Sequence, residues 1–215
     1  MNQNKIILDL CGGTGAWGEP YRKAGYDYRL ITLPQYNVFN YDPPADVYGI
    51  LAAPMCTHFS LVRTSAKTPR DLKKGMALVT RCLEIIWQCN YELPNKNSKI
   101  TKLKFWAMEN PNGFLKYFLG KPALEFNPFD YGDRYQKRTH LWGWFNEPKK
   151  SPIELTVAEK IKFTGNGQRL PALKERNLFC PDGYEFTGRV EQDKRGVCRS
   201  ITPAGFAKAF FEANQ

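Results

Sequence analysis

Cys56 is the residue of this sequence best placed to act as a nucleophile. It follows an almost wholly apolar stretch at residues 46–53 and precedes a loop rich in Lys and Arg. The reactive form of a cysteine is the thiolate, which nearby cations such as Arg63, Lys67 and Arg70 would favour by lowering the thiol pKa. We therefore take Cys56 as the candidate nucleophile of the chain.

The remaining chemistry around this residue is open on sequence grounds. A lone cysteine is more often a small buried side chain than a reactive one. We interpret Cys11, Cys82 and Cys89 in that way. His58 stands two residues after Cys56, and that spacing alone does not identify it as a base for the thiol.

Two further segments carry side chains that could bind a nucleobase. Residues 108–113 place Glu109 where an apolar stretch ends, and a carboxyl in a partly dry pocket can hold a proton and share it with a base nitrogen. Residues 135–143 carry Arg138, whose guanidinium can hold a carbonyl oxygen or a phosphate through directed donors. Each residue could equally belong to a turn or a salt bridge.

A glycine-rich turn, Asp9–Gly15, follows the first apolar stretch. It lacks the Gly-Lys-Ser/Thr of a phosphate-binding P-loop, and no acid stands where a dinucleotide-binding motif would need one. The turn is consistent with a cofactor that approaches the backbone closely, and the alternative is a tight turn without a ligand.

The elements around these segments alternate between strand and helix. Apolar stretches predict strands, and helical spacing of apolar residues predicts helices. The predicted strands are 5–10, 28–32, 46–53, 103–108 and 139–145, and the predicted helices are 19–24, 75–87 and 203–214. This alternation predicts an α/β fold with a doubly wound, mostly parallel sheet, whose ligands bind at the carboxyl ends of the strands.

Composition sets the broad class. The chain has 215 residues, of which 42% are hydrophobic, so we expect one compact domain. No apolar stretch is long enough to cross a membrane, and the N-terminus turns polar too early for a secretory signal. We therefore expect a cytoplasmic protein. We also expect it to be a monomer. Six scattered cysteines and two histidines suggest neither a metal site nor a disulfide framework.

The charge points to a polyanionic partner. The formal net charge is +10 and the isoelectric point is near 9.3. Contacts between Lys or Arg and phosphates gain free energy from the release of counterions. We expect a nucleic acid as the partner, and the alternative is a basic surface that is simply solvated.

Taken in order, four of these motifs resemble the cytosine-C5 DNA methyltransferase family, and most closely its short, phage-type members. The matching motifs are Asp9-x-x-x-Gly13-x-Gly15, Cys56-x-x-Phe59-Ser60, Glu109-Asn110-Pro111 and Gln136-x-Arg138. Residues 199–214 resemble the C-terminal motif that packs back beside the cofactor. The resemblance covers about residues 5–145 and 199–214.

The resemblance implies a Rossmann-like, S-adenosylmethionine-dependent enzyme that methylates carbon 5 of a flipped-out cytosine in double-stranded DNA. It assigns the catalytic roles to Cys56, Glu109 and Arg138. The positions it assigns to the cofactor are Asp9, Cys11, Gly13, Gly15, Thr32, Leu33, Asn37, Val38 and Pro54. Those it assigns to the substrate are Ser60, Arg63, Asn110, Pro111, Gln136 and His140.

The sequence departs from the family pattern near the cofactor. Met55 separates Pro54 from the nucleophile, and Cys11 replaces the usual aromatic residue of the glycine motif. Thr32–Pro34 stand where an acid normally binds the ribose, and Asn37 stands where an Asp is usual. His140 replaces the second Arg of the strand that holds the base.

The resemblance also divides the chain. Residues 1–145 would form the catalytic core, and residues 199–215 a C-terminal helix that packs back on it. Residues 146–198 would form a small basic accessory lobe, a reduced version of the domain that recognises the target sequence, so we expect short or relaxed specificity. The alternatives are the same reaction on RNA of the tRNA type, a catalytically idle nucleic-acid-binding relative and, from another class, a nicotinamide-dependent dehydrogenase.

Overall fold

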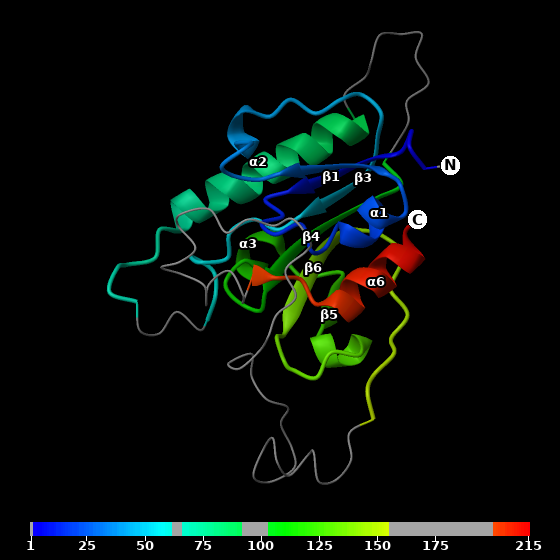
Figure 1. The fold of residues 1–215 in the computed structure, drawn as a ribbon. Coiled ribbons are helices and arrows are strands. Elements are labelled where there is room, and N and C mark those ends of the chain that lie inside the picture. The colour runs from blue at the N-terminus through cyan, green and yellow to red at the C-terminus, as the bar shows by residue number, and fades with distance from the viewer. Residues whose placement is uncertain (1, 62–65, 92–102, 155–199) are drawn as a thin grey trace.

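A computed structural model describes residues 2–61, 66–91, 103–154 and 200–215. Within them a single six-stranded sheet has the order β2-β1-β3-β4-β6-β5 (Figure 1). The strands are β1 Ile6–Leu10, β2 Asp27–Ile31, β3 Val47–Ala52, β4 Phe105–Pro111, β5 Leu124–Phe126 and β6 Thr139–Trp144.

The sheet is mostly parallel. β1 pairs in parallel with β2 and β3, and β3 pairs in parallel with β4. β6 runs antiparallel to both of its neighbours, β4 and β5, so it alone is reversed. β1 and β3 are almost entirely buried, which explains their continuous apolar sequences, because a central parallel strand is covered on both faces.

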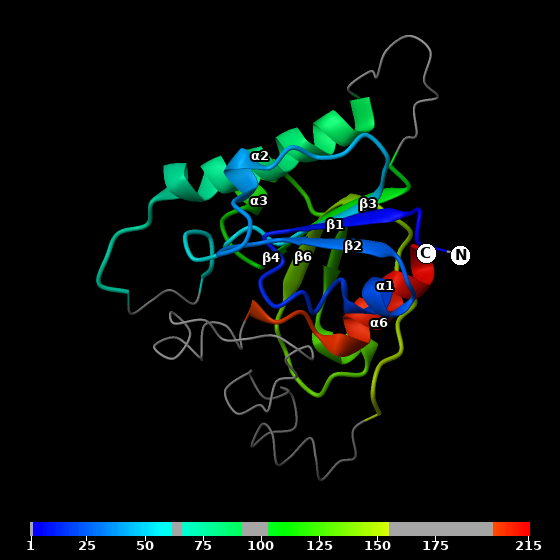
Figure 2. The same ribbon diagram turned by 45° about the horizontal axis from the view of Figure 1, so that its top comes forward.

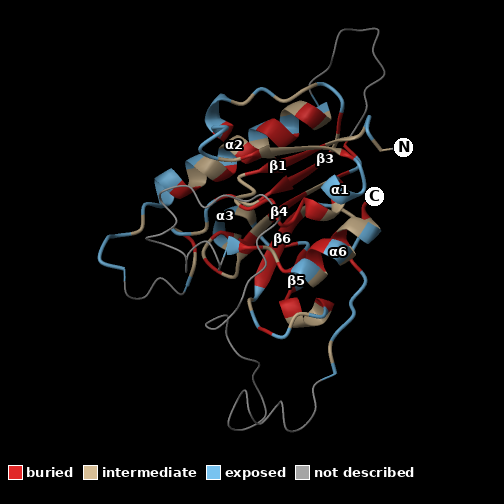
Figure 3. Cartoon of the chain, in the orientation of Figure 1, coloured by how far each residue is buried: buried red, intermediate tan, exposed pale blue. Residues whose placement is uncertain are grey.

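Helices cover both faces of the sheet. The helical elements are α1 Glu19–Lys23, η1 Val38–Asn40, α2 Leu72–Tyr91, α3 Lys116–Leu119, η2 Pro128–Tyr131 and α6 Ala204–Ala213. Figure 2 shows α2 on one side of the sheet, and α1 and α6 on the other. Figure 3 shows that the strands between them are largely buried. The predicted doubly wound α/β fold is therefore confirmed.

The two faces have separate hydrophobic cores. The α2 side buries Val79, Cys82, Ile85 and Ile86 of the helix against Leu8, Ile50 and Met108 of the strands. These helix positions recur at three- and four-residue spacing, so one stripe of α2 faces the sheet. The opposite core joins α1, α6 and η2 to the other side of the same strands.

The second core is largely aromatic. Phe206 of α6 stacks on Phe126 of β5, with ring centroids 3.9 Å apart, and also contacts Trp17 and Tyr131. Phe210, one turn further along α6, meets Trp17 edge to face at 5.4 Å. The C-terminal helix thus supplies much of the packing on this face.

The end of α6 is fixed by reciprocal hydrogen bonds. The Asn146 amide donates to Asn214 Oδ1 at 2.8 Å, and Asn214 Nδ2 donates to the Asn146 carbonyl at 3.0 Å. These bonds attach the chain end to the segment that leaves β6. The division of the chain at residue 146 stays a prediction, because residues 155–199 lie outside the described part.

The bounds of several predicted strands and helices differ from those in the structure. The predicted strand 103–108 ends too early, because β4 continues through Glu109, Asn110 and Pro111 as they pair with β6. The helix predicted at 75–87 extends to Leu72–Tyr91. β5 has only three residues and was missed by the sequence patterns.

No helix in the described ranges is long and apolar enough to cross a membrane. In the same ranges, no group of three or more His, Cys, Asp or Glu side chains is placed to hold a metal ion.

The aromatic core provides a test of the role of α6. Phe206→Ala removes a fully buried ring and leaves a cavity, so we expect a loss of about 3–5 kcal/mol in the free energy of unfolding, measured by urea denaturation. Tyr117→Ala, at a side chain that is 75% exposed, is the control and should change little. Equal effects of the two variants would contradict this packing.

Candidate active site

The carboxyl ends of β1, β3 and β4 lie beside one another at one edge of the sheet (Figure 1). The chain leaves these ends through the glycine-rich turn, the Cys56 loop and the segment after Pro111. The Ala53 amide donates to the Leu10 carbonyl at 2.9 Å, which joins the first two strand ends. Three of the four predicted motifs are therefore gathered where a doubly wound sheet binds its ligands.

The glycine-rich turn depends on left-handed backbone conformations. Cys11, Gly13 and Gly15 have φ angles of 58°, 58° and 72°. A Cβ on Gly12 would lie 2.2 Å from Asp9 Oδ1, so the turn closes directly over that carboxyl group. A Cβ on Gly13 would meet nothing within 4 Å, so the backbone there has open space beside it that a ligand could use.

Asp9 supports this turn from below. It is fully buried and accepts a hydrogen bond of 2.7 Å from the Tyr28 hydroxyl, while its Oδ1 has no hydrogen-bond partner among the described residues. Burial raises the pKa of Asp9 to about 7, although hydrogen bonds from Tyr28 and the Gly18 backbone oppose the shift. The carboxyl group thus lies beneath the turn, not on its open side.

Cys11 connects the turn to α2. Its sulfur lies 4.0 Å from that of Cys82, which is fully buried on the helix. All four described cysteines, Cys11, Cys56, Cys82 and Cys89, are free thiols. A small thiol at position 11 fits between the turn and the helix.

The segment after β2 supplies no acid to a ligand. Leu33 is 65% exposed and is followed by a cis peptide bond to Pro34. The Asn37 side chain accepts the Phe39 amide at 3.1 Å and thereby caps η1, while Val38 is buried in the core. Asn37 therefore caps a helix and Val38 packs in the core, whereas Leu33 presents an apolar surface.

The Cys56 loop is a tight turn. The amides of Phe59 and Ser60 both donate to the Cys56 carbonyl at 2.9 Å. Phe59 is fully buried and anchors the turn, whereas Met55, next to Cys56, is 48% exposed. The extra residue between Pro54 and Cys56 is accommodated by turning its side chain outward.

Three contacts attach this loop to the end of β4. Asn110 Nδ2 donates to the Pro54 carbonyl at 2.9 Å. The Phe114 amide donates to the Phe59 carbonyl at 2.9 Å, and Ser60 forms an antiparallel bridge with Gly113. The structure therefore brings together the predicted residues Pro54, Cys56, Ser60, Glu109, Asn110 and Pro111.

The environment of the Cys56 thiol differs from the sequence expectation. Burial raises its pKa, the negative charge of Glu109 raises it further, and Lys137 opposes both. Arg70, expected to act as a nearby cation, donates to the His58 carbonyl at 3.1 Å and lies over the Phe114 ring. The expected lowering of the thiol pKa by the basic loop is therefore wrong for the described residues.

His58 has another partner. Its Nδ1 accepts the Asp71 amide at 3.0 Å, immediately before the start of α2. This bond fixes the loop to the helix. Arg63 lies outside the described residues.

Lys137 is a site residue that the sequence patterns did not identify. Its Nζ lies 3.7 Å from Glu109 Oε1, and the two side chains are only 15% and 13% exposed. The alternation of side chains along an extended chain could have indicated it, because Lys137, just before β6, shares a face with Thr139 and Leu141 of that strand.

Arg138 and His140 face a different acid. Arg138 Nε lies 3.9 Å and His140 Nε2 lies 3.6 Å from Glu125 Oε2, on β5. The Arg138 side chain is 63% exposed, whereas His140 is buried and burial lowers its pKa. Gln136 is exposed. The structure thus places Lys137, and not Arg138, beside Glu109.

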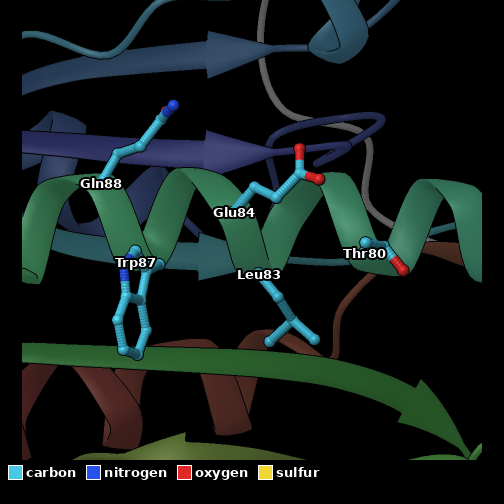
Figure 4. A pocket seen from close by; sticks show the side chains of 5 residues that line it. All are labelled: Thr80, Leu83, Glu84, Trp87 and Gln88. Carbon is cyan, nitrogen blue, oxygen red and sulfur yellow. The ribbon is translucent and has the colours of Figure 1, made fainter.

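Two shallow hollows lie on the outer surface of α2, away from these loops. One is lined by Thr80, Leu83, Glu84, Trp87 and Gln88, with the Leu83 and Trp87 side chains extending from the same side of the helix (Figure 4). The other lies beside it, between α2 and Phe39. None of the predicted site residues lines either hollow.

Comparisons with known proteins add little to this geometry. No protein-family model matches the sequence, and no curated protein matches it significantly. Among solved structures, the Entamoeba histolytica methyltransferase EhMeth is similar, with a TM-score of 0.43 and 12% sequence identity. The alignment covers 72% of this chain and 58% of that methyltransferase, so the chain spans less than two thirds of its length.

The buried carboxyl group of Asp9 provides a test of the glycine turn. An unfolded Asp ionises near pH 3.8, whereas the folded one keeps its proton to about pH 7, so the folded state loses stability between these values. Asp9→Asn cannot ionise. Its unfolding free energy relative to wild type should therefore rise by up to about 1.4 kcal/mol for each pH unit between 5 and 7.

The measurement is urea denaturation of both proteins across this pH range. Asp27→Asn is the matched control, because its hydrogen bond to Arg29 lowers the Asp27 pKa and places its effect below pH 4. A constant difference between Asp9→Asn and wild type from pH 5 to 7 would contradict the buried, protonated carboxyl group.

Proposed function

We propose that this protein transfers a methyl group from S-adenosylmethionine to carbon 5 of cytosine in double-stranded DNA, through a covalent bond between Cys56 and the base. One observation supports the proposal most strongly. The loop of the nucleophile and the Glu109-Asn110-Pro111 strand end are attached to each other by the Asn110–Pro54 hydrogen bond and the Ser60–Gly113 bridge. The proposed reaction needs a nucleophile and a carboxyl group in fixed positions, and these contacts hold Cys56 and Glu109 at the same end of the sheet.

The glycine turn is consistent with the methyl donor. The open backbone beside Gly13 and the left-handed turn at Gly15 would hold its amino-acid part, while Leu33 and Pro54 would face its less polar parts. The buried Asp9 supports that turn from beneath. When bound, S-adenosylmethionine supplies a methyl group on a positively charged sulfur, which a carbon nucleophile can attack.

The roles of the protein follow from the chemistry of cytosine. Carbon 5 of cytosine is a weak nucleophile, and addition of the Cys56 thiolate to carbon 6 makes it enamine-like. When the base binds, the Glu109 carboxylate takes up a proton from water and holds it at N3, which neutralises the charge that develops on the ring. After methyl transfer the proton on carbon 5 leaves to a base, water being sufficient, and the carbon–sulfur bond to Cys56 breaks.

The protein must also receive the base. A cytosine inside a duplex cannot reach Cys56 unless it is flipped out of the stack. The exposed residues Lys67, Lys73 and Lys74, which follow the Cys56 loop, are suited to phosphate contacts. The net charge of +10 supports a polyanionic substrate in the same way.

The test is methyl transfer from labelled S-adenosylmethionine to duplex DNA. Wild type should label cytosine carbon 5, and Cys56→Ala should lower the rate by on the order of 10³-fold or more, because the covalent step is lost. Cys89→Ala, which removes a thiol from α2 outside the site, is the matched control and should retain activity.

A duplex that contains 5-fluorocytosine sharpens the result. Because fluorine cannot leave as the proton does, the enzyme should remain bound through Cys56 and migrate as a complex on a denaturing gel. The absence of such a complex together with active transfer would contradict the covalent mechanism. Labelling of tRNA but not of duplex DNA would contradict the DNA substrate.

A further inference from the structure

Lys137 has no part in the chemistry outlined so far, although it lies inside the site. Its ammonium is 3.7 Å from the Glu109 carboxylate, and both side chains are mostly buried. A lysine is seldom buried unless it is paired, because its charge is costly to remove from water. Its buried position therefore indicates a role other than that of a solvated surface charge.

The backbone around Lys137 is anchored on both sides. The Thr139 hydroxyl donates to the Lys137 carbonyl at 2.8 Å, and the Asn112 amide donates to the Arg138 carbonyl at 2.9 Å. Tyr135, two residues earlier, is buried. The chain thus holds Lys137 in place at the end of β4.

The neighbouring cations are directed elsewhere. Arg138 and His140 alternate with Lys137 along the chain and lie beside Glu125 of β5. Arg70 is bonded to the loop backbone at His58. In the described ranges, Lys137 is the positive group that acts on both Cys56 and Glu109.

The charges of the site explain why a cation is needed there. A thiolate at Cys56 beside a carboxylate at Glu109 would place two negative charges in a mostly buried site, which is unfavourable. Glu109 indeed raises the pKa of the thiol, and Lys137 acts in the opposite direction. One ammonium group reduces the net charge of the ionised cluster from two negative charges to one.

We propose, on the basis of the proposed function, that Lys137 is a positioning residue that balances the Glu109 carboxylate and thereby allows Cys56 to form its thiolate. In this step the S–H bond breaks, its electron pair stays on sulfur, and the proton passes to water. Lys137 itself keeps its protons throughout and makes no bond to the substrate.

Two charged groups act on the Cys56 thiol, Glu109 of β4 and Lys137 of the segment before β6. His58, in the same loop, and Arg70, which lies before α2, make other contacts. The His58 ring accepts the Asp71 amide, and Arg70 donates to the His58 carbonyl. The pH dependence of the thiol should therefore follow the Glu109–Lys137 pair.

The test measures the thiolate directly, without methyl donor or DNA. The rate at which iodoacetamide alkylates Cys56 is followed from pH 6 to 10 and resolved from the other five cysteines by peptide mass spectrometry. Lys137→Met should move the midpoint upward by roughly 1 pH unit. Below the midpoint, alkylation then slows about tenfold for each unit.

Three further variants separate charge from packing. Lys137→Arg keeps the cation and should restore the wild-type profile, and Glu109→Gln should move the midpoint downward. Lys150→Met is the matched control, because it removes an equal charge from the ion pair with Asp130, outside the site, and should leave the profile unchanged. Thermal unfolding confirms that each variant is folded.

The outcomes are distinct. Coincident profiles for Lys137→Met and wild type, or a Lys137→Arg profile that matches Lys137→Met, would overturn the role of Lys137. If the predicted shifts occur but wild type methylates neither DNA nor RNA, the proposed function fails while the electrostatic role of Lys137 stands. If methylation occurs without the shifts, only the role of Lys137 fails.

Discussion

The hydrogen bond from the Asn110 side chain to the Pro54 carbonyl is the contact on which the site depends. Pro54 is buried two residues after the end of β3, so its carbonyl would be left unsatisfied beneath the loop without this donor. Asn110 is fully buried, and its amide can reach the carbonyl because β4 continues as far as Pro111. The bond makes the positions of Cys56 and Glu109 interdependent.

Close packing reinforces this dependence. A Cβ on Gly113 would lie 2.2 Å from the Phe59 carbonyl oxygen, so no other residue allows the segment after β4 to approach the Cys56 loop so closely. Phe59 in turn packs against α2, where a Cβ on Gly75 would lie 2.9 Å from its ring. The position of Cys56 is thereby coupled to the core beneath α2, and rigidity of this kind is what the proposed reaction requires, because it depends on defined geometry.

The sequence was sufficient for the central strands of the sheet and for placing three of the motifs at their carboxyl ends. The apolar stretches of β1 and β3 identify central strands because burial on both faces leaves no room for alternation. The end of β4 could not be predicted, because Glu109-Asn110-Pro111 has turn-forming residues and becomes a strand only through pairing with β6. β5 is too short to show a period, and the reversed direction of β6 leaves no trace in its own sequence.

The electrostatics of the site were the least predictable part. Counting cations after Cys56 suggested a lowered thiol pKa, but a charge acts through its distance and its exposure, and Arg70 is bonded to backbone instead. Burial determines the sign at both Cys56 and Asp9, whose pKa values rise because their charged forms lose hydration. Lys137 opposes this effect at Cys56. The antiparallel pairing of β6 with β4 brings the segment before β6 alongside Glu109, and this placement of a cation is a feature of the fold and not of the motif.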